Sequence, residues 1–340
     1  MTRRVTIVDV AERAGVAISS VSSALNDRPG VSEETRRRIL AVADELGFVR
    51  SVRARSLSAQ RAFAVGLAVQ RDADVLESDP FFGAFIGGVE SVLSTRGSAL
   101  VLQLGVDRAH TLSRYRELAA ARRVDGVFLS DIEVDDPRVE LLQSLRMPAV
   151  GINPDRDFPF PSVRQDGDAG IAELLGHLRE LGHRRVAHVR GPEHAIHARS
   201  RERAWREAER ALGLEPGPLL RGDFTFESGL AAADALLALD ERPSAVFCSN
   251  DLMAVGVMAR FEDLGLRIPD DLSVAGYDGV AMGDYVRPTL TTLRTTPRRI
   301  GEEAARMLLE LIDGGEAADV DVEPVELVVR GSTGPFTMRG

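Results

Sequence analysis

Residues 5–26 read VTIVDVAERAGVAISSVSSALN, and this stretch predicts two short helices joined by a tight turn. Thr6 and Asp9 have the Thr-x-x-acid spacing of a capping box, so a helix is expected to begin directly after Thr6. Gly15 stands where the end of that helix needs a residue that tolerates a positive φ. The apolar residues between them fall on one helical stripe: Ile7, Val10, Ala11 and Ala14.

Two further helices complete a small domain over residues 1–48. The second is predicted over 18–25, and Ser32 can cap a third. Residues 26–30, Asn-Asp-Arg-Pro-Gly, have the composition of a turn. The inward-facing residues expected on the two helices are Val21, Ala24 and Leu25, then Ile39, Val42, Ala43 and Leu46. Two helices joined by a glycine turn and closed by a third form the helix-turn-helix arrangement. Periodicity alone leaves a generic three-helix interaction module open as the alternative.

The charge of the chain is unevenly distributed. Residues 1–61 contain 11 arginines and 7 acidic residues, a balance of +4, whereas residues 62–340 contain 31 arginines and 45 acidic residues, a balance of −14. A basic head on an acidic body is typical of a DNA-binding protein with a separate sensor domain. On charge alone, chance clustering in a short segment is the alternative.

The head resembles the LacI/GalR (lactose-repressor) family of transcriptional regulators. The residues that carry the resemblance are 5–16, Ser20-Val-Ser22, Leu25-Asn26 and Val31-Ser-x-Glu-Thr-Arg36, and their order and spacing match over about sixty residues. The resemblance implies that Ile18, Ser19 and Ser23 face base edges in the major groove. It also implies that Thr6, Ser20, Ser22 and Asn26 hydrogen-bond phosphates and set the register on DNA.

Two residues of the head depart from the family pattern. Ser23 stands where the family usually has an arginine, so a bidentate contact with guanine is unavailable there. Ala17 replaces the usual serine cap of the recognition helix, a change that costs about 1 kcal/mol of local stability. The operator is therefore expected to differ from the family's commonest sequence.

Residues 49–61 resemble the family's hinge helix, which becomes ordered only on the operator. The segment 51–57 is too short to be a stable helix alone. The resemblance implies that Leu57 wedges into the central base step from the minor groove, with Ala54 as a neighbouring contact and Arg53 and Arg55 near phosphates. Arg50-Ser51 replaces the usual Pro-Asn before this segment. The alternative is that Leu57 packs the linker against the sensor.

The remaining residues, 62–340, alternate short apolar runs with longer amphipathic stretches. Strands are expected at 63–69, 99–104, 127–129, 149–152, 186–189, 245–248 and 273–277. Helices are expected between them, for example at 83–95, 111–121, 169–181, 199–212, 228–239 and 252–264. Such alternation predicts an α/β fold of parallel sheets with helices on both faces, divided into two similar lobes. Ligands bind at the carboxyl ends of such strands.

The sequence gives little indication of an enzyme, cofactor or metal site. It has no GxGxxG after a strand, no GxxxxGK[ST] and no GxSxG, so it lacks the characteristic motifs of dinucleotide, triphosphate and serine-hydrolase sites. Five of the six histidines fall between residues 177 and 197, but structural roles are favoured over a metal site. Cys248 lies in an apolar run and is interpreted as a buried packing residue. We therefore expect neither an enzyme nor a cofactor.

The family resemblance continues through the sensor. The motifs, all in family order, are 79–82, 123–126, 181–186, 249–251, 268–274, 276–278, 288–292 and 330–333. It implies a periplasmic-binding-protein-like sensor in which the chain crosses between lobes three times. The N-lobe is then expected at about 62–161 and 293–322, and the C-lobe at about 162–292 and 323–340.

The effector-binding positions implied by the resemblance are Gln70, Phe81, Ser130, Asn153, Arg201, Asn250 and Asp278. An arginine fork at Arg201 and a carboxylate at Asp278 can bracket the vicinal hydroxyls of a sugar through charge-assisted hydrogen bonds. Phe81 or Phe82 can supply an apolar face for the ring. Each of these residues is also compatible with a structural role.

The expected mechanism is a population shift. A homodimer presents two heads to a near-palindromic DNA operator, and a small-molecule effector, a carbohydrate in preference to a purine, turns the lobes and weakens the hinges. Some family members are instead tightened by a corepressor, so the sign of the response stays open. The N-terminus lacks a secretion signal and no apolar run reaches about 20 residues, so a cytoplasmic protein without membrane contact is expected. No heptad pattern follows residue 333, which favours a dimer over a tetramer. A solute-binding receptor without a DNA-binding role is the alternative.

Overall fold

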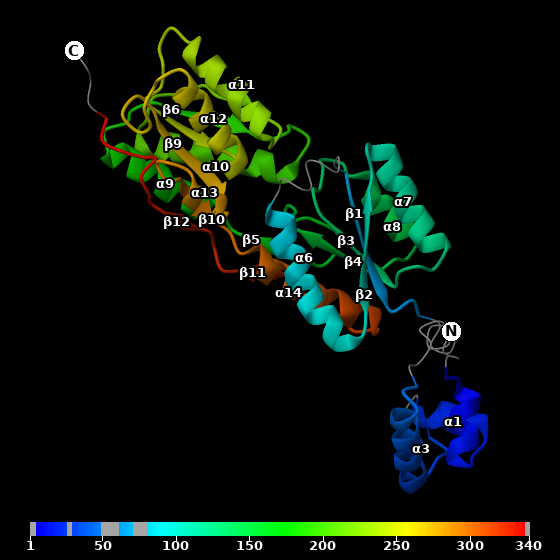
Figure 1. The fold of residues 1–340 in the computed structure, drawn as a ribbon. Coiled ribbons are helices and arrows are strands. Elements are labelled where there is room, and N and C mark those ends of the chain that lie inside the picture. Colours follow the sequence, from blue (N-terminus) through cyan, green and yellow to red (C-terminus); the bar gives the residue numbers. More distant parts are fainter. Residues whose placement is uncertain (1–4, 26–28, 49–60, 71–79, 337–340) are drawn as a thin grey trace. The chain divides into compact units, whose positions relative to one another are not determined.

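The computed structural model describes residues 5–25, 29–48, 61–70 and 80–336. The chain separates into two compact units, Met1–Arg61 and Ala62–Gly340. The first unit is helical, and the second contains two sheets with helices on both faces of each (Figure 1). The predicted fold class is confirmed.

The head consists of α1 (Ile7–Ala14), α2 (Ile18–Leu25) and α3 (Glu33–Glu45). The predicted capping box is present, because the Thr6 hydroxyl accepts a hydrogen bond from the Asp9 amide and the Asp9 carboxylate accepts one from the Thr6 amide, at 3.4 and 2.7 Å. Gly15 ends α1 with a φ of 65°. The Ser32 hydroxyl accepts a hydrogen bond from the Thr35 amide at the start of α3. These local signals therefore set the helix boundaries.

The three helices enclose one small core. The buried residues are Val10, Ala11, Ala14, Val21, Ala24, Leu25, Ile39 and Ala43. All of them were predicted, whereas the predicted residues Ile7, Val42 and Leu46 are only partly buried at its edge. Arg13 on α1 and Glu45 on α3 form an ion pair of 3.0 Å across the surface.

The sheet of the N-lobe has six strands in the order β11-β5-β4-β3-β1-β2. Their bounds are β1 Ala64–Val69, β2 Ala99–Leu104, β3 Gly126–Leu129, β4 Ala149–Ile152, β5 Ser162–Gln165 and β11 Val320–Val322. All neighbouring strands pair in parallel. Every residue of β1, β3 and β4 is buried, which explains why these strands read as continuous apolar runs.

The sheet of the C-lobe also has six strands, in the order β12-β10-β9-β8-β6-β7. Their bounds are β6 Val186–Arg190, β7 Leu219–Arg221, β8 Ala245–Cys248, β9 Ser273–Asp278, β10 Thr291–Arg294 and β12 Glu326–Val328. The strands are parallel except for β12, which pairs antiparallel with β10. The predicted parallel sheet is therefore present, with one antiparallel strand at this edge.

Helices cover both faces of each sheet. The N-lobe helices are α6 (Pro80–Leu93) and α14 (Pro297–Ile312) on one face, with α7 (Arg108–Ala120) and α8 (Pro137–Ser144) on the other. The C-lobe helices are α11 (Phe226–Leu237) and α12 (Asp251–Asp263) on one face, with α9 (Asp168–Glu180) and α10 (Ile196–Leu212) on the other. The short helix α13 (Met282–Tyr285) and the 3-10 turn η1 (Ser94–Arg96) lie in connections.

Helices α6 and α14 pack side by side through two glycines (Figure 1). A Cβ on Gly88 would lie 2.0 Å from the carbonyl oxygen of Arg298, and one on Gly301 would lie 2.2 Å from that of Phe85. Both distances are far shorter than any van der Waals contact, so only glycine permits this approach. The crossing fixes α6, whose first turn carries Phe81 and Phe82.

The chain crosses between the lobes three times, after β5, β10 and β11. Strand β5 pairs in the N-lobe sheet, so that lobe extends to Gln165 before the first crossing. Strand β10 pairs in the C-lobe sheet, so the C-lobe extends to Arg294 before the second crossing. Both strands run directly into a crossing, where sequence pattern does not show which sheet a strand joins.

The side chain of Gln165 connects all three crossings. Its Nε2 donates to the Thr296 hydroxyl at 3.1 Å and to the Glu323 carbonyl at 2.8 Å, and its Oε1 accepts from the Thr296 amide at 3.1 Å. One side chain from the first crossing is thereby bonded to the second and the third. Among the described residues, no helix is long and apolar enough to span a membrane.

Candidate functional site

Two adjoining cavities lie between the N-lobe and the C-lobe. The smaller, called the inner compartment, has a volume of about 60 Å³, and the larger, called the outer compartment, has about 370 Å³. They share the lining residues Phe81, Asn153, His197 and Arg201. Because strands of both sheets end here, this is the edge at which parallel sheets bind ligands.

Six of the seven predicted effector residues line the inner compartment. They are Phe81, Ser130, Asn153, Arg201, Asn250 and Asp278. The seventh, Gln70, is half-buried just after β1 and is not among the lining residues of either compartment. The described part of the pocket therefore gives no support to a role for Gln70.

Arg201 is held in position by three contacts. Its Nη1 donates to the carbonyl oxygen of Ser249 at 2.5 Å, and its guanidinium carbon lies 3.7 Å from the centre of the Tyr277 ring. Its Nη2 lies 3.9 Å from a carboxylate oxygen of Asp278, beyond hydrogen-bond distance. The guanidinium fork is therefore pre-organised beside a carboxylate that it attracts without a direct hydrogen bond.

The backbone of Asp278 is strained. Its φ of 117° is rarely adopted by a residue with a side chain. The amide and the hydroxyl of Thr295 both donate to the Asp278 carbonyl at 3.0 Å, which holds this conformation at the end of β9. A strained residue maintained in a pocket wall is a common feature of functional sites.

Asn250 and Asn153 use polar atoms of their side chains inside the protein. Asn250 caps α12 by accepting from the Met253 amide, and it donates to the Phe224 carbonyl, both at 2.9 Å. The Asn153 Oδ1 accepts from the Gln165 amide at 2.9 Å. Both polar ends of the Asn250 amide are therefore engaged in shaping the wall.

Ser130 differs from these residues. It is 3% exposed, and its hydroxyl has no hydrogen-bond partner within the part of the chain that the structure describes. A buried hydroxyl without a partner is unfavourable, so its presence in a pocket wall indicates a group that a ligand completes.

The loop that carries Ser130 is fixed by a buried ion pair. Arg138 contacts Asp136 at 2.6 Å and donates to the carbonyls of Ser130 and Asp131, each at 3.0 Å. Burial opposes the ionisation of Asp136, but the hydrogen bonds and charge of Arg138 outweigh it and lower the pKa of this carboxyl. The loop at the inner compartment is therefore rigid.

A cluster of aromatic rings positions the residue whose carbonyl binds Arg201. His188 lies between the rings of Trp205 and Phe247, and burial lowers its pKa to about 3. The neutral ring donates from Nδ1 to the Phe247 carbonyl at 2.9 Å and accepts at Nε2 from the Ser249 hydroxyl at 3.2 Å. Ser249 is thereby held so that its own carbonyl can accept from Arg201. Trp205, one helical turn from Arg201, is wholly buried in this cluster.

Four lining residues of the inner compartment were not predicted to bind effector: Asp131, Ile152, His197 and Phe224. His197 stacks on Phe224 with ring centres 5.2 Å apart and an angle of 16°. His197 precedes Arg201 by four residues on α10, and this helical spacing is the signal that could have found it. Nothing in the sequence marks Phe224, which reaches the pocket from a connection after β7.

Metal and nucleophile chemistry are not supported by the described residues. They contain no group of three His, Cys, Asp or Glu side chains that could hold a metal ion. His183 bonds to Ser244 and to the Gly334 carbonyl, so it has a structural role. Burial raises the pKa of the Cys248 thiol, which keeps it protonated and unreactive.

One face of α2 in the head is exposed to solvent, and it consists of serines and Ile18. Ile18 is 49% exposed, Ser19 is exposed, and Ser20, Ser22 and Ser23 are half-buried. The opposite face carries the core residues Val21, Ala24 and Leu25. Thr6 is exposed next to α1, and its hydroxyl also contacts Asp9 at 2.7 Å. The predicted contacts Asn26, Arg53, Ala54 and Leu57 lie outside the described residues.

Family models match both units of the chain. Residues 6–51 match bacterial regulatory proteins of the lacI family, and residues 175–333 match a periplasmic binding protein-like domain. The transcriptional repressor PurR of Photobacterium profundum is 32% identical over 333 residues, covering 96% of this chain and 98% of that protein. The transcriptional regulator CelR of Thermobifida fusca is 33% identical over 335 residues, covering 96% of each.

Solved structures of regulators have a similar fold. The complex of the transcriptional regulator CelR with cellobiose has a TM-score of 0.74 at 32% identity and covers 97% of this chain and 100% of that one. The lac repressor dimer bound to operator and the anti-inducer ONPF has a TM-score of 0.85 at 26% identity, covering 98% and 100%. The head and the two-lobed sensor define a DNA-binding transcriptional regulator, not an enzyme. The chain belongs to the lacI family of bacterial regulatory proteins.

Proposed function

We propose that this protein is a cytoplasmic repressor that binds a near-palindromic operator as a dimer, and that a neutral sugar bound between its lobes controls this binding. The observation that carries the proposal is the inner compartment, where Arg201 and Asp278 flank a space that also contains the unpartnered hydroxyl of Ser130. A forked donor, a carboxylate acceptor and a hydroxyl match the alternating hydroxyls of a sugar.

The charges around the two compartments favour a neutral ligand. Four arginines and four aspartates line the outer compartment, and Asp131 and Asp278 add to the acidic side in the inner one. An anionic effector would face more carboxylates than guanidinium groups. The rings of Phe81 and Phe224 offer apolar faces on which a sugar ring can pack. The cellobiose bound by the related CelR agrees with this ligand class.

The exposed face of α2 is the proposed base-reading surface. Ile18, Ser19 and Ser23 would contact base edges, and the isoleucine side chain suits a thymine methyl group. Thr6, Ser20, Ser22 and Asn26 would contact phosphates, and Arg53, Ala54 and Leu57 would enter the minor groove. The exposure of Ile18 supports this assignment, because the side chain has no role in the core of the head. The operator-bound lac repressor dimer supports a dimer here.

The sugar would act by population shift. Each arrangement of the lobes presents a different cavity, and a ligand changes the balance only through its different affinity for the two. Arg201 and Ser130 come from different lobes, so a ligand that contacts both favours the arrangement in which they are close.

The test combines a DNA-binding assay with a ligand screen on the full chain. An operator selected from random duplexes should be bound in preference to competitor DNA, with an affinity that falls steeply with salt. Neutral sugars, sugar phosphates and purines are then screened by thermal shift and added to the operator complex. We expect a neutral sugar to raise the melting temperature and change operator affinity. A protein that binds sugar but prefers no duplex would be a receptor, and a purine-only response would contradict the sugar assignment.

A further inference from the structure

We infer that the outer compartment is a second sugar subsite, so that the effector is a glycoside of at least two rings. This inference rests on the proposed function, since it names the kind of sugar that the same site would take. It follows from the size of the compartment, its polar walls, one unpartnered donor and the balance of charge.

Size is the first argument. The inner compartment has about 60 Å³, and the outer one, about 370 Å³, reaches by itself the range of roughly 300–1,000 Å³ that is usual for ligand pockets. A single ring held by Ser130, Arg201 and Asp278 would leave most of this space to water. Because Arg201 and Asn153 line both compartments, one ligand can continue from the inner into the outer.

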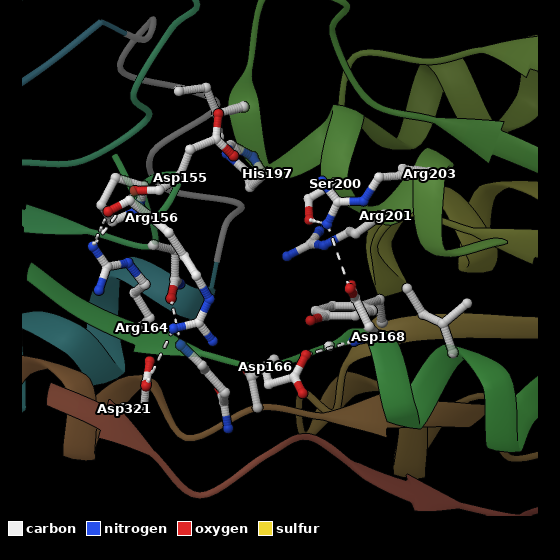
Figure 2. A pocket seen from close by; sticks show the side chains of 18 of the residues that line it. Asp155, Arg156, Arg164, Asp166, Asp168, His197, Ser200, Arg201, Arg203 and Asp321 are labelled. Atoms are coloured by element: carbon white, nitrogen blue, oxygen red, sulfur yellow. Dashed lines mark hydrogen bonds and ion pairs between the residues drawn. The ribbon is translucent and has the colours of Figure 1, made fainter. Parts of the chain in front are cut away.

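The walls of the outer compartment are polar on both sides. Figure 2 shows Asp155, Arg156, Arg164 and Asp321 on one side and Asp168, Ser200, Arg201 and Arg203 on the other. The first group belongs to the N-lobe and the second to the C-lobe. Such walls suit a hydroxyl-rich group more than an apolar substituent.

Arg164 supplies a donor that the protein leaves unpaired. It is 8% exposed, and its Nη1 is fixed by the Asp319 carboxylate at 2.7 Å. Its Nε is buried and has no hydrogen-bond partner among the described residues. Ser130 has the corresponding unpartnered group in the inner compartment. Ser130 lines the inner compartment and Arg164 lines the outer one, so each compartment has one lining residue with a buried polar atom that lacks a partner among the described residues. A ligand that supplies an oxygen to both atoms must span the two compartments.

The balance of charge in the outer compartment indicates whether the second ring of the ligand is charged or neutral. The guanidinium groups of the outer compartment are offset by carboxylates: Arg203 lies 3.4 Å from Asp168 and Arg156 lies 3.7 Å from Asp321. A phosphate or carboxylate substituent would meet these aspartates, whereas sugar hydroxyls can both donate to them and accept from Arg164. The second unit is therefore a neutral sugar.

The experiment is titration calorimetry of the full-length protein with paired ligands. Glucose is compared with maltose and cellobiose, galactose with lactose and melibiose, and xylose with xylobiose. A disaccharide should bind about tenfold or more tightly than its own monosaccharide, since the second ring adds hydrogen bonds. Arg164→Lys keeps a positive charge opposite Asp319 but removes the Nε–H group. It should lower disaccharide affinity about fivefold and leave monosaccharide affinity unchanged.

Two further variants make the result specific. Arg260→Lys alters an arginine that is ion-paired with Asp234 at 2.7 Å on the surface of the C-lobe, and it should change neither affinity. Ser200→Phe places a ring in the outer compartment and should reduce disaccharide affinity to that of the monosaccharide. Equal affinity for one and two rings, or no selective loss in Arg164→Lys and Ser200→Phe, would overturn this inference and leave the sugar effector standing. Failure of every sugar to bind would overturn both.

Discussion

The backbone of Glu133 pairs antiparallel with that of Ala195, which joins the loop after β3 in the N-lobe to the start of α10 in the C-lobe. The Val134 amide donates to the His194 carbonyl at 3.1 Å, and the Ile196 amide donates to the Ile132 carbonyl at 3.0 Å. The Glu133 side chain also forms an ion pair with Arg108. The same loop carries Ser130 and the same helix carries Arg201, so this bridge connects the two walls of the proposed effector site.

Ile196→Pro should weaken this bridge without breaking α10. Ile196 is the first residue of the helix, where proline is tolerated, and Ala195 already has the extended conformation that precedes proline. Proline removes only the amide that donates to Ile132, a loss of about 1 kcal/mol. Hydrogen exchange at the Val134 amide should rise about fivefold. Ile196→Ala, which keeps the amide, is the control, and equal exchange in the two variants would contradict the prediction.

Arg201→Ala should abolish the response to effector while operator binding persists. The arginine contacts Ser249, Tyr277 and Asp278 in the pocket wall and belongs to the sensor unit, not to the head. Charge-assisted hydrogen bonds to a ligand are worth about 1.5–3 kcal/mol each, so effector affinity should fall at least tenfold. Arg199→Ala, an exposed neighbour on the same helix, is the matched control. Dose–response curves of operator release measure both, and a normal curve for Arg201→Ala would remove this residue from the site.

Ile18→Ser should lower operator affinity while the head keeps its stability. The side chain is 49% exposed, so little core packing is lost, whereas an apolar contact with a thymine methyl is worth about 1 kcal/mol, or roughly fivefold in affinity. Leu40→Ser on α3 is the matched control, because Leu40 is 41% exposed but lies outside α2. Fluorescence anisotropy with the selected operator measures both variants. Equal losses would show that α2 does not read the bases.

Gly88→Ala should destabilise the sensor by about 1–3 kcal/mol, because its Cβ would overlap the carbonyl of Arg298 on α14. A Cβ on the adjacent Gly87 of the same helix would meet no atom within 4 Å, so Gly87→Ala should be neutral or stabilising by up to about 1 kcal/mol. Urea unfolding of both variants gives the comparison. A loss of stability in both would point to the helix itself and away from the crossing.

Two buried groups should give opposite pH dependences of stability. Burial raises the pKa of Asp251 to about 7, so the native state holds a proton that the unfolded state releases above its value of 3.8. The contribution of Asp251 to the free energy of unfolding therefore falls as pH rises from about 4 to 7, by up to about 1.4 kcal/mol per pH unit. Burial lowers the pKa of His188 from 6.5 to about 3. Its contribution to the free energy of unfolding therefore falls as pH falls from about 6.5 to 3, because only the unfolded state binds the proton in this range.

Asp251→Asn separates these effects. It should leave the acid sensitivity of His188 uncompensated, so that the variant loses stability more steeply than the wild type between pH 6.5 and 4. Chemical unfolding at several pH values measures this difference. Stability curves that stay parallel over the whole range would mean that Asp251 does not titrate in this window.

Much of the fold was predictable from the sequence because its central strands are buried on both faces. Apolar runs predicted the inner strands β1, β3, β4, β6, β8 and β9, and also the edge strand β2. The strands that were not predicted are short or polar, such as Thr291–Arg294 and Val320–Val322, and lie beside the crossings or at sheet edges. Val320–Val322 pairs with β5, which is distant in the chain, so local pattern contains little information about this pairing.

The candidate site was less predictable from physical pattern. Phe81, Arg201 and Asp278 were proposed through family resemblance, since no spacing brings them together along the chain. The unpartnered hydroxyl of Ser130 and the internal bonding of Asn250 depend on tertiary neighbours and could not be read from residue type. The pocket role of Phe224 likewise depends on where a connection returns to the sheet edge.

The bonds of Gln165 to Thr296 and Glu323 make the three interlobe segments a single mechanical joint. Three independent interlobe segments would allow the lobes to bend, twist and slide relative to one another. Segments that are bonded to one another share one axis of rotation. The expected relative motion of the lobes is then a hinge rotation about that axis. A ligand in the space between the lobes would therefore change the angle between them.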